Sequence, residues 1–315
     1  MSFLLDDCYP RLAPRPSIPG GQINVQRSIA ALQEAPGKKM RSQVDTEAAD
    51  GRNRPSNNLV VMRLKQLGYL SDGDQSELLS AFDAPRKASP KSSIDRGHDQ
   101  ASSVRFIQQG FAYRYIGLPD GRQQITSLLL PGDTCDSLAL AAPNTEHGIC
   151  ALTTVIYSEI KRPAIDSLIE NNPRIAVALW RSFLLNEAML YERIASLGQR
   201  SAKERLAHFL CEVFFRCRAV GLTSGMQCNL PLSQGDLGDT LGLSLVHTNR
   251  SLMALRADRL ITLESRLLTI VDLARLQETA HFNPRYLQLA PDVTAPVRHA
   301  SNTMAFDHPH RNAHI

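Results

Sequence analysis

The sequence predicts an α+β protein that combines an antiparallel β-roll, a long dimerisation helix and a C-terminal winged helix-turn-helix. Three observations carry this prediction. Short β-type runs without helices between them lie between residues 104 and 162, which is typical of an antiparallel roll. A helical stretch without glycine follows from Pro173 to Leu197. Two short capped helices around a glycine turn, followed by a β-hairpin, fill Ser233 to Ile270.

Length and composition set the broad class. The 315 residues suffice for two ordinary domains and leave residues over for tails. No apolar run approaches the ~20 residues of a membrane span, and no basic start with a long apolar core marks a secretory signal. We therefore expect a cytoplasmic protein. The six cysteines form no CxxC pair and predict no metal site, and the net charge of +4 is compatible with nucleic acid without arguing strongly for it.

Composition and pattern divide the chain into five segments. The first is rich in proline and poor in large apolar residues, so it cannot bury enough surface to offset the entropy of ordering. We predict a disordered extension at 1–57, a sensor-like roll at 58–172, a dimerisation helix at 173–198, a winged helix-turn-helix domain at 199–275 and a disordered tail at 276–315. Five histidines lie in this tail, at 281, 299, 308, 310 and 314, and we interpret them as tail residues rather than as a metal site.

The roll segment begins with helical spacing from Asn58, and either Ser71 or Asp74 is placed to cap the next amphipathic turn. The turn Pro119-Asp-Gly121 between two alternating β-type runs predicts a hairpin. Residues 84–103 are polar and predict a loop or a poorly formed strand pair. The completeness of the roll therefore stays open.

The long helix carries a heptad pattern, and a polar residue in such a seam commonly fixes the pairing of helices. Steps of four and three connect the six residues that we predict to form a dimer seam: Leu179, Phe183, Asn186, Leu190, Arg193 and Leu197. The alternative is a helix packed only on its own domain. Gly198 is expected to end this helix, and Ser201 with Glu204 forms a capping box that opens the next one.

The helix-turn-helix is predicted from its caps and glycines. Ser233 is placed to cap a first short helix, and the small Gly238 allows a second helix to approach it closely. Gly242 stands where the chain must turn sharply, and Ser244 caps the second helix, which runs from Leu245 to about residue 257. Two β-type runs, 260–263 and 267–270, then predict a two-stranded wing.

A second helix of this kind presents its N-terminal turns to the DNA major groove. Arg250 is the strongest candidate for reading a base, because its guanidinium matches O6 and N7 of guanine. Asn249 is suited to a base edge or a phosphate, and the two cap serines to phosphate. The predicted DNA-contacting residues are Ser233, Gln234, Ser244, Leu245, Val246, His247, Asn249 and Arg250.

From about Asn58 to Leu276 the chain resembles the Crp/Fnr superfamily of bacterial regulators. The resemblance rests on LPDGRQQITSLLLPGD at 118–133, LGQRSAKERLAHFL at 197–210 and the block from Ser233 to Leu263. It implies a cyclic-nucleotide-binding-like roll and a homodimer joined along the long helix. It also implies a roughly palindromic site in double-stranded DNA, with half-sites about one turn apart, and RNA polymerase as a candidate partner.

The chain departs from the family where cyclic nucleotides bind. Asp136 and Ser137 replace the Gly-Glu pair, and His147 and Gly148 replace the arginine and hydroxyl pair that hold the ribose and phosphate. An aspartate there would repel a phosphate, so we expect the effector not to be cyclic AMP. Only Cys8 stands where oxygen-sensing members carry a cysteine cluster, which argues against a [4Fe–4S] cofactor. No residue argues for haem, and the effector is left unassigned.

The recognition helix also departs from the family. Leu245 and Val246 stand where Arg or Glu is frequent; they either contact thymine methyl groups or leave specificity to fewer polar contacts. Thr248 replaces a branched apolar anchor, which is expected to loosen the helix slightly.

The residues bear on three function classes. An enzyme is disfavoured, because Cys135, Asp136 and His147 make no recognisable catalytic constellation and no metal spacing or phosphate loop is present. A protein-interaction module with a vestigial DNA-binding part is the alternative. The favoured interpretation is a dimeric DNA-binding transcription factor.

Overall fold

The computed structural model describes residues 58–94, 103–135, 147–290 and 293. The chain divides into two compact units, 1–41 and 42–315, and every described residue belongs to the second. The predicted extension at 1–57, most of the predicted tail, and Asp136 and Ser137 lie outside the described residues. Among the helices that are described, none is long and apolar enough to cross a membrane.

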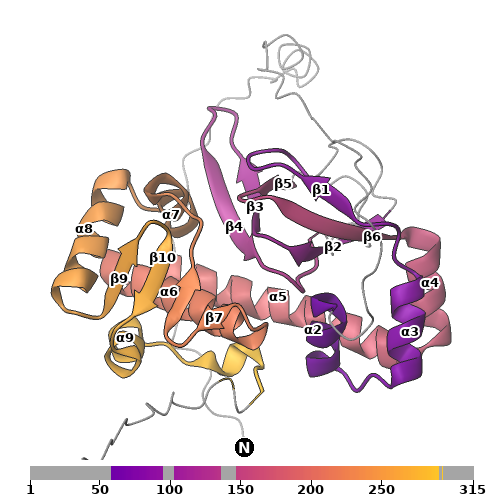
Figure 1. Ribbon diagram of the computed structural model, residues 1–315. Coiled ribbons are helices and arrows are strands. Elements are labelled where there is room, and N and C mark those ends of the chain that lie inside the picture. The colour runs from indigo at the N-terminus through magenta and orange to yellow at the C-terminus, as the bar shows by residue number, and fades with distance from the viewer. Residues whose placement is uncertain (1–57, 95–102, 136–146, 291–292, 294–315) are drawn as a thin grey trace, which may run out of the picture. The chain divides into compact units, whose positions relative to one another are not determined.

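Two three-stranded antiparallel sheets form the roll (Figure 1). One has the order β1-β6-β2 and the other β4-β3-β5. Ile107, Leu129 and Tyr157 are among the side chains that form the core of this roll. The strands are β1 (Arg86–Ala88), β2 (Ser103–Gln109), β3 (Ala112–Gly117), β4 (Gln123–Leu129), β5 (His147–Ala151) and β6 (Val155–Lys161).

The predicted hairpin joins β3 to β4. The N–H of Leu118 donates to the carbonyl of Arg122 at 2.7 Å, and Gly121 supplies the positive φ of 86° that the turn needs. The polar stretch at 84–103 contributes β1, whose three residues pair with β6. Part of that stretch is therefore a short strand.

Three helices pack beside the roll: α2 (Leu59–Leu67), α3 (Asp72–Ser80) and α4 (Arg162–Asn171). Their apolar faces join strands β2 and β6 in a second core that includes Val60, Leu64, Phe106 and Ile165. Ser71 is the cap of α3, and its hydroxyl and the Asp74 carboxylate form a reciprocal capping box. This settles the choice that the sequence left between those two residues.

Helix α5 (Pro173–Gln199) extends from the helices beside the roll to the C-terminal winged domain (Figure 1). The expected break at Gly198 is wrong, because the helix continues to Gln199 and Arg200 is its C-cap. An exposed glycine costs a helix only about 1 kcal/mol, which a long packed helix tolerates. The chain leaves the helix where Ser201 caps the next one.

The predicted seam is covered in part: Leu190 is 39% exposed, but other members of the seam pack within the chain. Leu179 is only 1% exposed and packs in the core beside the roll, and Arg193 is paired with buried Glu212. The large apolar side chains that α5 exposes most lie on another face: Val177, Trp180, Leu184, Tyr191 and Ile194. They step by 3, 4, 7 and 3, so a heptad period is present on this second stripe. The sequence pattern contained two apolar stripes and did not say which one the chain covers.

The winged domain begins with α6 (Ala202–Ala219), which Ser201 and Glu204 cap as predicted. Its sheet has four strands in the order β7-β8-β10-β9, so the two predicted wing strands are joined by a further hairpin. The elements are β7 (Thr223–Ser224), β8 (Gln227–Asn229), α7 (Gln234–Leu241), α8 (Leu245–Ala257), β9 (Ile261–Glu264) and β10 (Leu267–Ile270).

Residues 276–290 are folded, which corrects the expected tail boundary at 276. Helix α9 (Leu273–Ala280) and the 3-10 turn η3 (Pro284–Leu287) pack on α6. Leu276 and Leu287 are fully buried, and Phe282 stacks on Phe215 with ring centroids 5.6 Å apart. The apolar pattern is short here, so the sequence alone resembles a polar tail.

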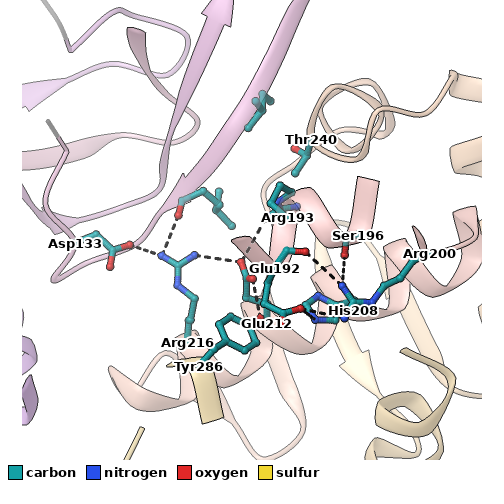
Figure 2. A network of polar contacts seen from close by, with 12 residues as sticks. Asp133, Glu192, Arg193, Ser196, Arg200, His208, Glu212, Arg216, Thr240 and Tyr286 are labelled. Atoms are coloured by element: carbon teal, nitrogen blue, oxygen red, sulfur yellow. Dashed lines mark hydrogen bonds and ion pairs between the residues drawn. The ribbon is translucent and has the colours of Figure 1, made fainter. Parts of the chain in front are cut away.

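One buried guanidinium joins the winged domain to the roll (Figure 2). Arg216 on α6 donates to the Asp133 carboxylate and to the backbone carbonyl of Leu128, at 2.5 and 3.0 Å. Its other nitrogen lies 3.8 Å from Glu212, one helical turn earlier. Burial by itself would lower the pKa of Arg216, but the charges of Asp133 and Glu212 outweigh it and raise that pKa.

Glu212 extends the network to α5 and η3. Its carboxylate accepts hydrogen bonds from Tyr286 at 2.9 Å and from Arg193 at 3.4 Å, and the Arg193 guanidinium also lies over the ring of Phe209. Burial, and then the charge of Glu212, raise the pKa of Tyr286. Its hydroxyl therefore keeps its proton and donates it to the hydrogen bond. Elements from four parts of the chain therefore meet at the carboxylates of Asp133 and Glu212.

His208 is a second buried titratable group beside this network (Figure 2). Its Nε2 lies 3.4 Å from the Glu192 carboxylate, but the two are not aligned as a hydrogen bond. Its ring packs on Phe282 and Tyr286. Burial, and then the nearby charge of Arg200, lower the pKa of His208 to about 4, although Glu192 acts in the opposite direction.

We expect Arg216→Met to destabilise the protein by about 3–5 kcal/mol, because the largely covered Asp133 loses its charge partner and the buried Glu212 loses one of two. Urea unfolding measures the change. Arg122→Met is the matched control: Arg122 also pairs with an aspartate, Asp120, but that pair is exposed, so less than about 1 kcal/mol is expected. Equal losses in the two variants would show that burial of the Arg216 pair has no energetic weight.

His208 should make stability fall in acid. Between pH 6.5 and about 4 the unfolded histidine binds a proton and the folded one does not, so stability is full above this window and is lost as the pH falls through it. The loss attributable to His208 is at most roughly 3 kcal/mol. His208→Gln and His208→Phe, the latter keeping a ring against Phe282, should both flatten the dependence of unfolding free energy on pH. Unchanged slopes in both variants would contradict this assignment.

Candidate nucleic-acid interface

The first helix of the helix-turn-helix, α7, is fixed at both ends. The Ser233 hydroxyl accepts from the N–H of Asp236 at 3.1 Å, and the Asp236 carboxylate accepts from the N–H of Ser233 at 2.7 Å. At the other end, Arg205 on α6 donates to the last carbonyl of α7, that of Leu241, at 2.7 Å. The predicted cap is confirmed, and α6 satisfies a carbonyl that a helix end leaves open.

Helix α7 also touches the roll. The Gln124 amide on β4 donates to the carbonyls of Asp239 and Thr240, at 2.6 and 3.3 Å, and the Gln123 amide donates to the Asp239 carboxylate at 2.9 Å. These contacts add to the Arg216 pair, so β4 holds both α6 and α7. Sequence reasoning missed them because nothing in a local pattern pairs residues 115 positions apart.

Two glycines shape the turn between the helices. Gly242 has a φ of 62°, a conformation that other residues adopt only with strain. Gly238 gives room: a Cβ there would lie 2.7 Å from the carbonyl oxygen of Leu243. Both roles match the sequence prediction, and both bring the second helix close to the first.

The second helix, α8, rests on a rigid base. The Ser244 hydroxyl accepts from the N–H of His247 at 3.3 Å, and Leu252 and Leu255 are fully buried in the domain core. Thr248 is also fully buried, and its hydroxyl donates to the Ser244 carbonyl at 3.1 Å. The expected loosening at Thr248 is not what the structure shows, because that hydroxyl is satisfied within the helix.

All eight predicted DNA-contacting residues lie on the exposed surface, at the starts of α7 and α8. They are Ser233, Gln234, Ser244, Leu245, Val246, His247, Asn249 and Arg250. The His247 ring is held by the Ser244 hydroxyl, 2.9 Å from Nδ1. The first turn of a helix has N–H groups without intrahelical partners, so the starts of α7 and α8 suit a phosphate.

The structure adds residues that the sequence analysis left out. Met253 is exposed one to two turns after Val246 and Arg250 on the same helix. Arg256, Arg259 and Arg266 are exposed around the end of α8 and the wing turn, and Arg256 donates to the carbonyl of Leu263 on β9 at 2.6 Å. The spacing of three and four from Val246 already pointed to Met253. The three arginines could be assigned to this surface only once the buried side chains and the position of the wing turn were known.

The roll carries the positions at which the family binds cyclic nucleotides, and the described residues include two of them, His147 and Gly148. Gly148 on β5 is paired with Tyr115 on β3, and a Cβ at Gly148 would lie 2.3 Å from the Tyr115 ring. That ring occupies the space into which a side chain at 148 would project. Cys135 and Arg114 are buried, and the Arg114 guanidinium donates to the carbonyls of Thr134 and Cys135.

Comparisons with known proteins agree with this architecture. A family model described as a Crp-like helix-turn-helix domain matches residues 204–279. The transcriptional activatory protein AadR of Rhodopseudomonas palustris is 30% identical over 225 residues, which are 70% of this chain and 91% of AadR. The transcriptional activator protein FnrL of Cereibacter sphaeroides is 29% identical over 189 residues, 58% of this chain and 74% of FnrL.

Solved structures give the same fold. FixK2 from Bradyrhizobium japonicum is similar with a TM-score of 0.56 and 25% identity, covering 62% of this chain and 96% of FixK2. A CooA mutant from Carboxydothermus hydrogenoformans has a TM-score of 0.53 at 16% identity, covering 74% of this chain and 98% of CooA. With its antiparallel roll, its long helix and its winged helix-turn-helix, this chain belongs to the Crp/Fnr superfamily of bacterial regulators and is a DNA-binding transcription factor.

Proposed function

We propose that this protein acts as a homodimer that binds a roughly palindromic operator, with α8 of each subunit in the major groove. The exposed start of α8 carries this proposal, because it combines a capped N-terminus with Asn249 and Arg250 on a rigid base. In this placement Arg250 contacts guanine, and Ser233, Gln234 and Ser244 contact phosphate. Arg256, Arg259 and Arg266 add positive charge beside the same surface.

The dimer interface is the exposed apolar stripe of α5, defined by Val177, Trp180, Leu184, Tyr191 and Ile194. Trp180 and Ile194 are 63% and 65% exposed, and side chains of this size are rarely left in water along a whole helix face. A period of three and four is that of two helices packed side by side. We propose this stripe in preference to the predicted seam, because Leu179 is buried and Arg193 is paired with Glu212 within the chain.

The effector of the roll is proposed to be something other than cyclic AMP. The Tyr115 ring fills the space beside Gly148, where relatives that hold a cyclic phosphate place a hydroxyl, and His147 stands in place of their arginine. The family further suggests that the bound dimer contacts RNA polymerase, in the cytoplasm, and that the chain regulates transcription without catalysing a reaction. In this proposal residues 1–57 and the chain end after 290 are extensions of a 58–290 body.

The operator is found by selecting bound sequences from random duplex DNA with the full chain. A gel shift on the selected site should weaken steeply as salt rises, because phosphate contacts release counterions. If selection recovers no common sequence at any salt concentration, the protein-interaction alternative gains and the proposal fails.

Arg250→Ala should lower affinity for the selected operator by about 1–3 kcal/mol and relax base choice at one position per half-site, because a bidentate contact to guanine is lost. Competition between operator and single-base variants measures this. Arg259→Ala is the control, since an exposed arginine outside α8 should change affinity for all sequences alike. A uniform loss in Arg250→Ala would make Arg250 a phosphate contact.

Ile194→Asp should yield monomers that bind the operator weakly, because a carboxylate would be buried in the proposed α5 interface. Sedimentation measures the mass. Ile169→Asp on α4 is the matched control, an exposed isoleucine away from α5, and should leave the dimer intact. An intact dimer in Ile194→Asp, or an equal effect of both changes, would refute the stripe as the interface.

A further inference from the structure

The exposed face of α8, which we propose binds DNA, is unusually apolar for a surface that contacts a polyanion. Leu245, Val246 and Met253 are 58%, 67% and 62% exposed. One exposed apolar side chain says little by itself, because such residues are scattered over most protein surfaces. Three of them on one helix, beside Arg250, form a patch that needs a partner of matching chemistry.

Helical spacing places these residues on the face that the domain leaves free. Counted from Val246, spacings of three, four and seven residues lead to Asn249, Arg250 and Met253. These residues therefore form one stripe of the helix, and Leu245 lies at its start. The opposite stripe, with Thr248, Leu252 and Leu255, is fully buried. The apolar patch is therefore directed away from the domain core and carries no packing role.

Charge around the patch identifies the partner as nucleic acid rather than protein. Arg250 lies within the stripe, and Arg256 and Arg266 are exposed near its end and at the wing turn. The capped start of α8 adds a partial positive charge at the other end. Apolar side chains framed by cations suit a duplex groove, whose edges are positioned by phosphate contacts.

In the major groove the only apolar group on a base edge is the C5-methyl of thymine. A valine offers no donor or acceptor, so against cytosine or adenine it would leave an amino group without a hydrogen bond. We propose that Val246, with Leu245 beside it, is a specificity-determining residue that selects thymine by its methyl group next to the guanine of Arg250. Met253, whose side chain is flexible, covers a neighbouring thymine methyl group.

This inference rests on the proposed operator binding, and its test starts from the selected operator. Each thymine of a half-site is replaced singly by deoxyuridine, which lacks only the methyl group. For the wild-type full chain we expect about a fourfold loss of affinity at one or two positions, the value of one buried methyl contact. At the position read by Val246, cytosine should bind poorly and 5-methylcytosine should recover about fourfold.

Two variants connect the methyl group to the residue. Val246→Ala should lose the sensitivity to deoxyuridine at one position and keep it elsewhere. Val246→Glu should change the preference there from thymine to cytosine, because a carboxylate accepts from the cytosine amino group. Val271→Ala is the matched control, an equally small change at an exposed valine after the wing, and should bind like the wild type.

The outcomes separate the inference from the proposed function. If selection recovers no operator, operator binding itself fails. If an operator is recovered but deoxyuridine is tolerated at every position, the methyl contact is refuted while operator binding stands. If the sensitivity persists unchanged in Val246→Ala, the assignment to Val246 is refuted. Thermal unfolding of each variant should match the wild type, because these side chains are exposed.

Discussion

The pairing of Arg216 with Asp133 and Glu212 is the contact on which the arrangement of the roll and the winged domain depends. Arg216 and Glu212 are buried and Asp133 is largely covered, so the cost of removing these charges from water must be offset by their pairing. A small displacement of α6 along β4 would therefore leave a charge unpaired rather than merely loosen a contact. The hydrogen bonds from Gln123 and Gln124 to α7 add to this contact between the roll and the winged domain. Strand β4 therefore helps to position the helix-turn-helix.

Helix α5 performs two tasks because it has two apolar stripes. One stripe, including Leu179 and Leu185, completes cores on its own chain. The other, with Trp180 and Ile194, is open and has the spacing of a helix pair. Arg193 looks like a polar residue in a seam but is an internal partner of Glu212. In the proposed dimer, α5 would therefore connect the packing within a subunit to the contact between subunits.

The recognition surface is formed by interactions between residues close in sequence, and contacts with residues far away in the sequence then stabilise it. Ser233, Ser244 and Gly242 define where α7 and α8 begin and how they turn, and each role follows from its own backbone chemistry. Arg205 and Gln124 then bind the carbonyls at the end of α7 from other parts of the chain. The result is an α8 supported by its domain, whose free face combines Arg250 with exposed apolar neighbours.

The sequence by itself determined the succession of roll, long helix and winged helix-turn-helix, the caps, the turn glycines and the exposed start of α8, because these depend on residues within a few positions of one another. It also identified the family through three motifs, which contain turns and helix starts of the fold. Only the tertiary structure decided which side chains of α5 are free, that residues 276–290 pack on α6, and that Arg256, Arg259 and Arg266 are exposed near α8 and the wing. These depend on what covers each side chain, and coverage comes from segments far apart in the sequence, as the bond between Gln124 and Asp239 illustrates. A helical pattern shows that a face is apolar, but the neighbour that buries it lies elsewhere in the chain.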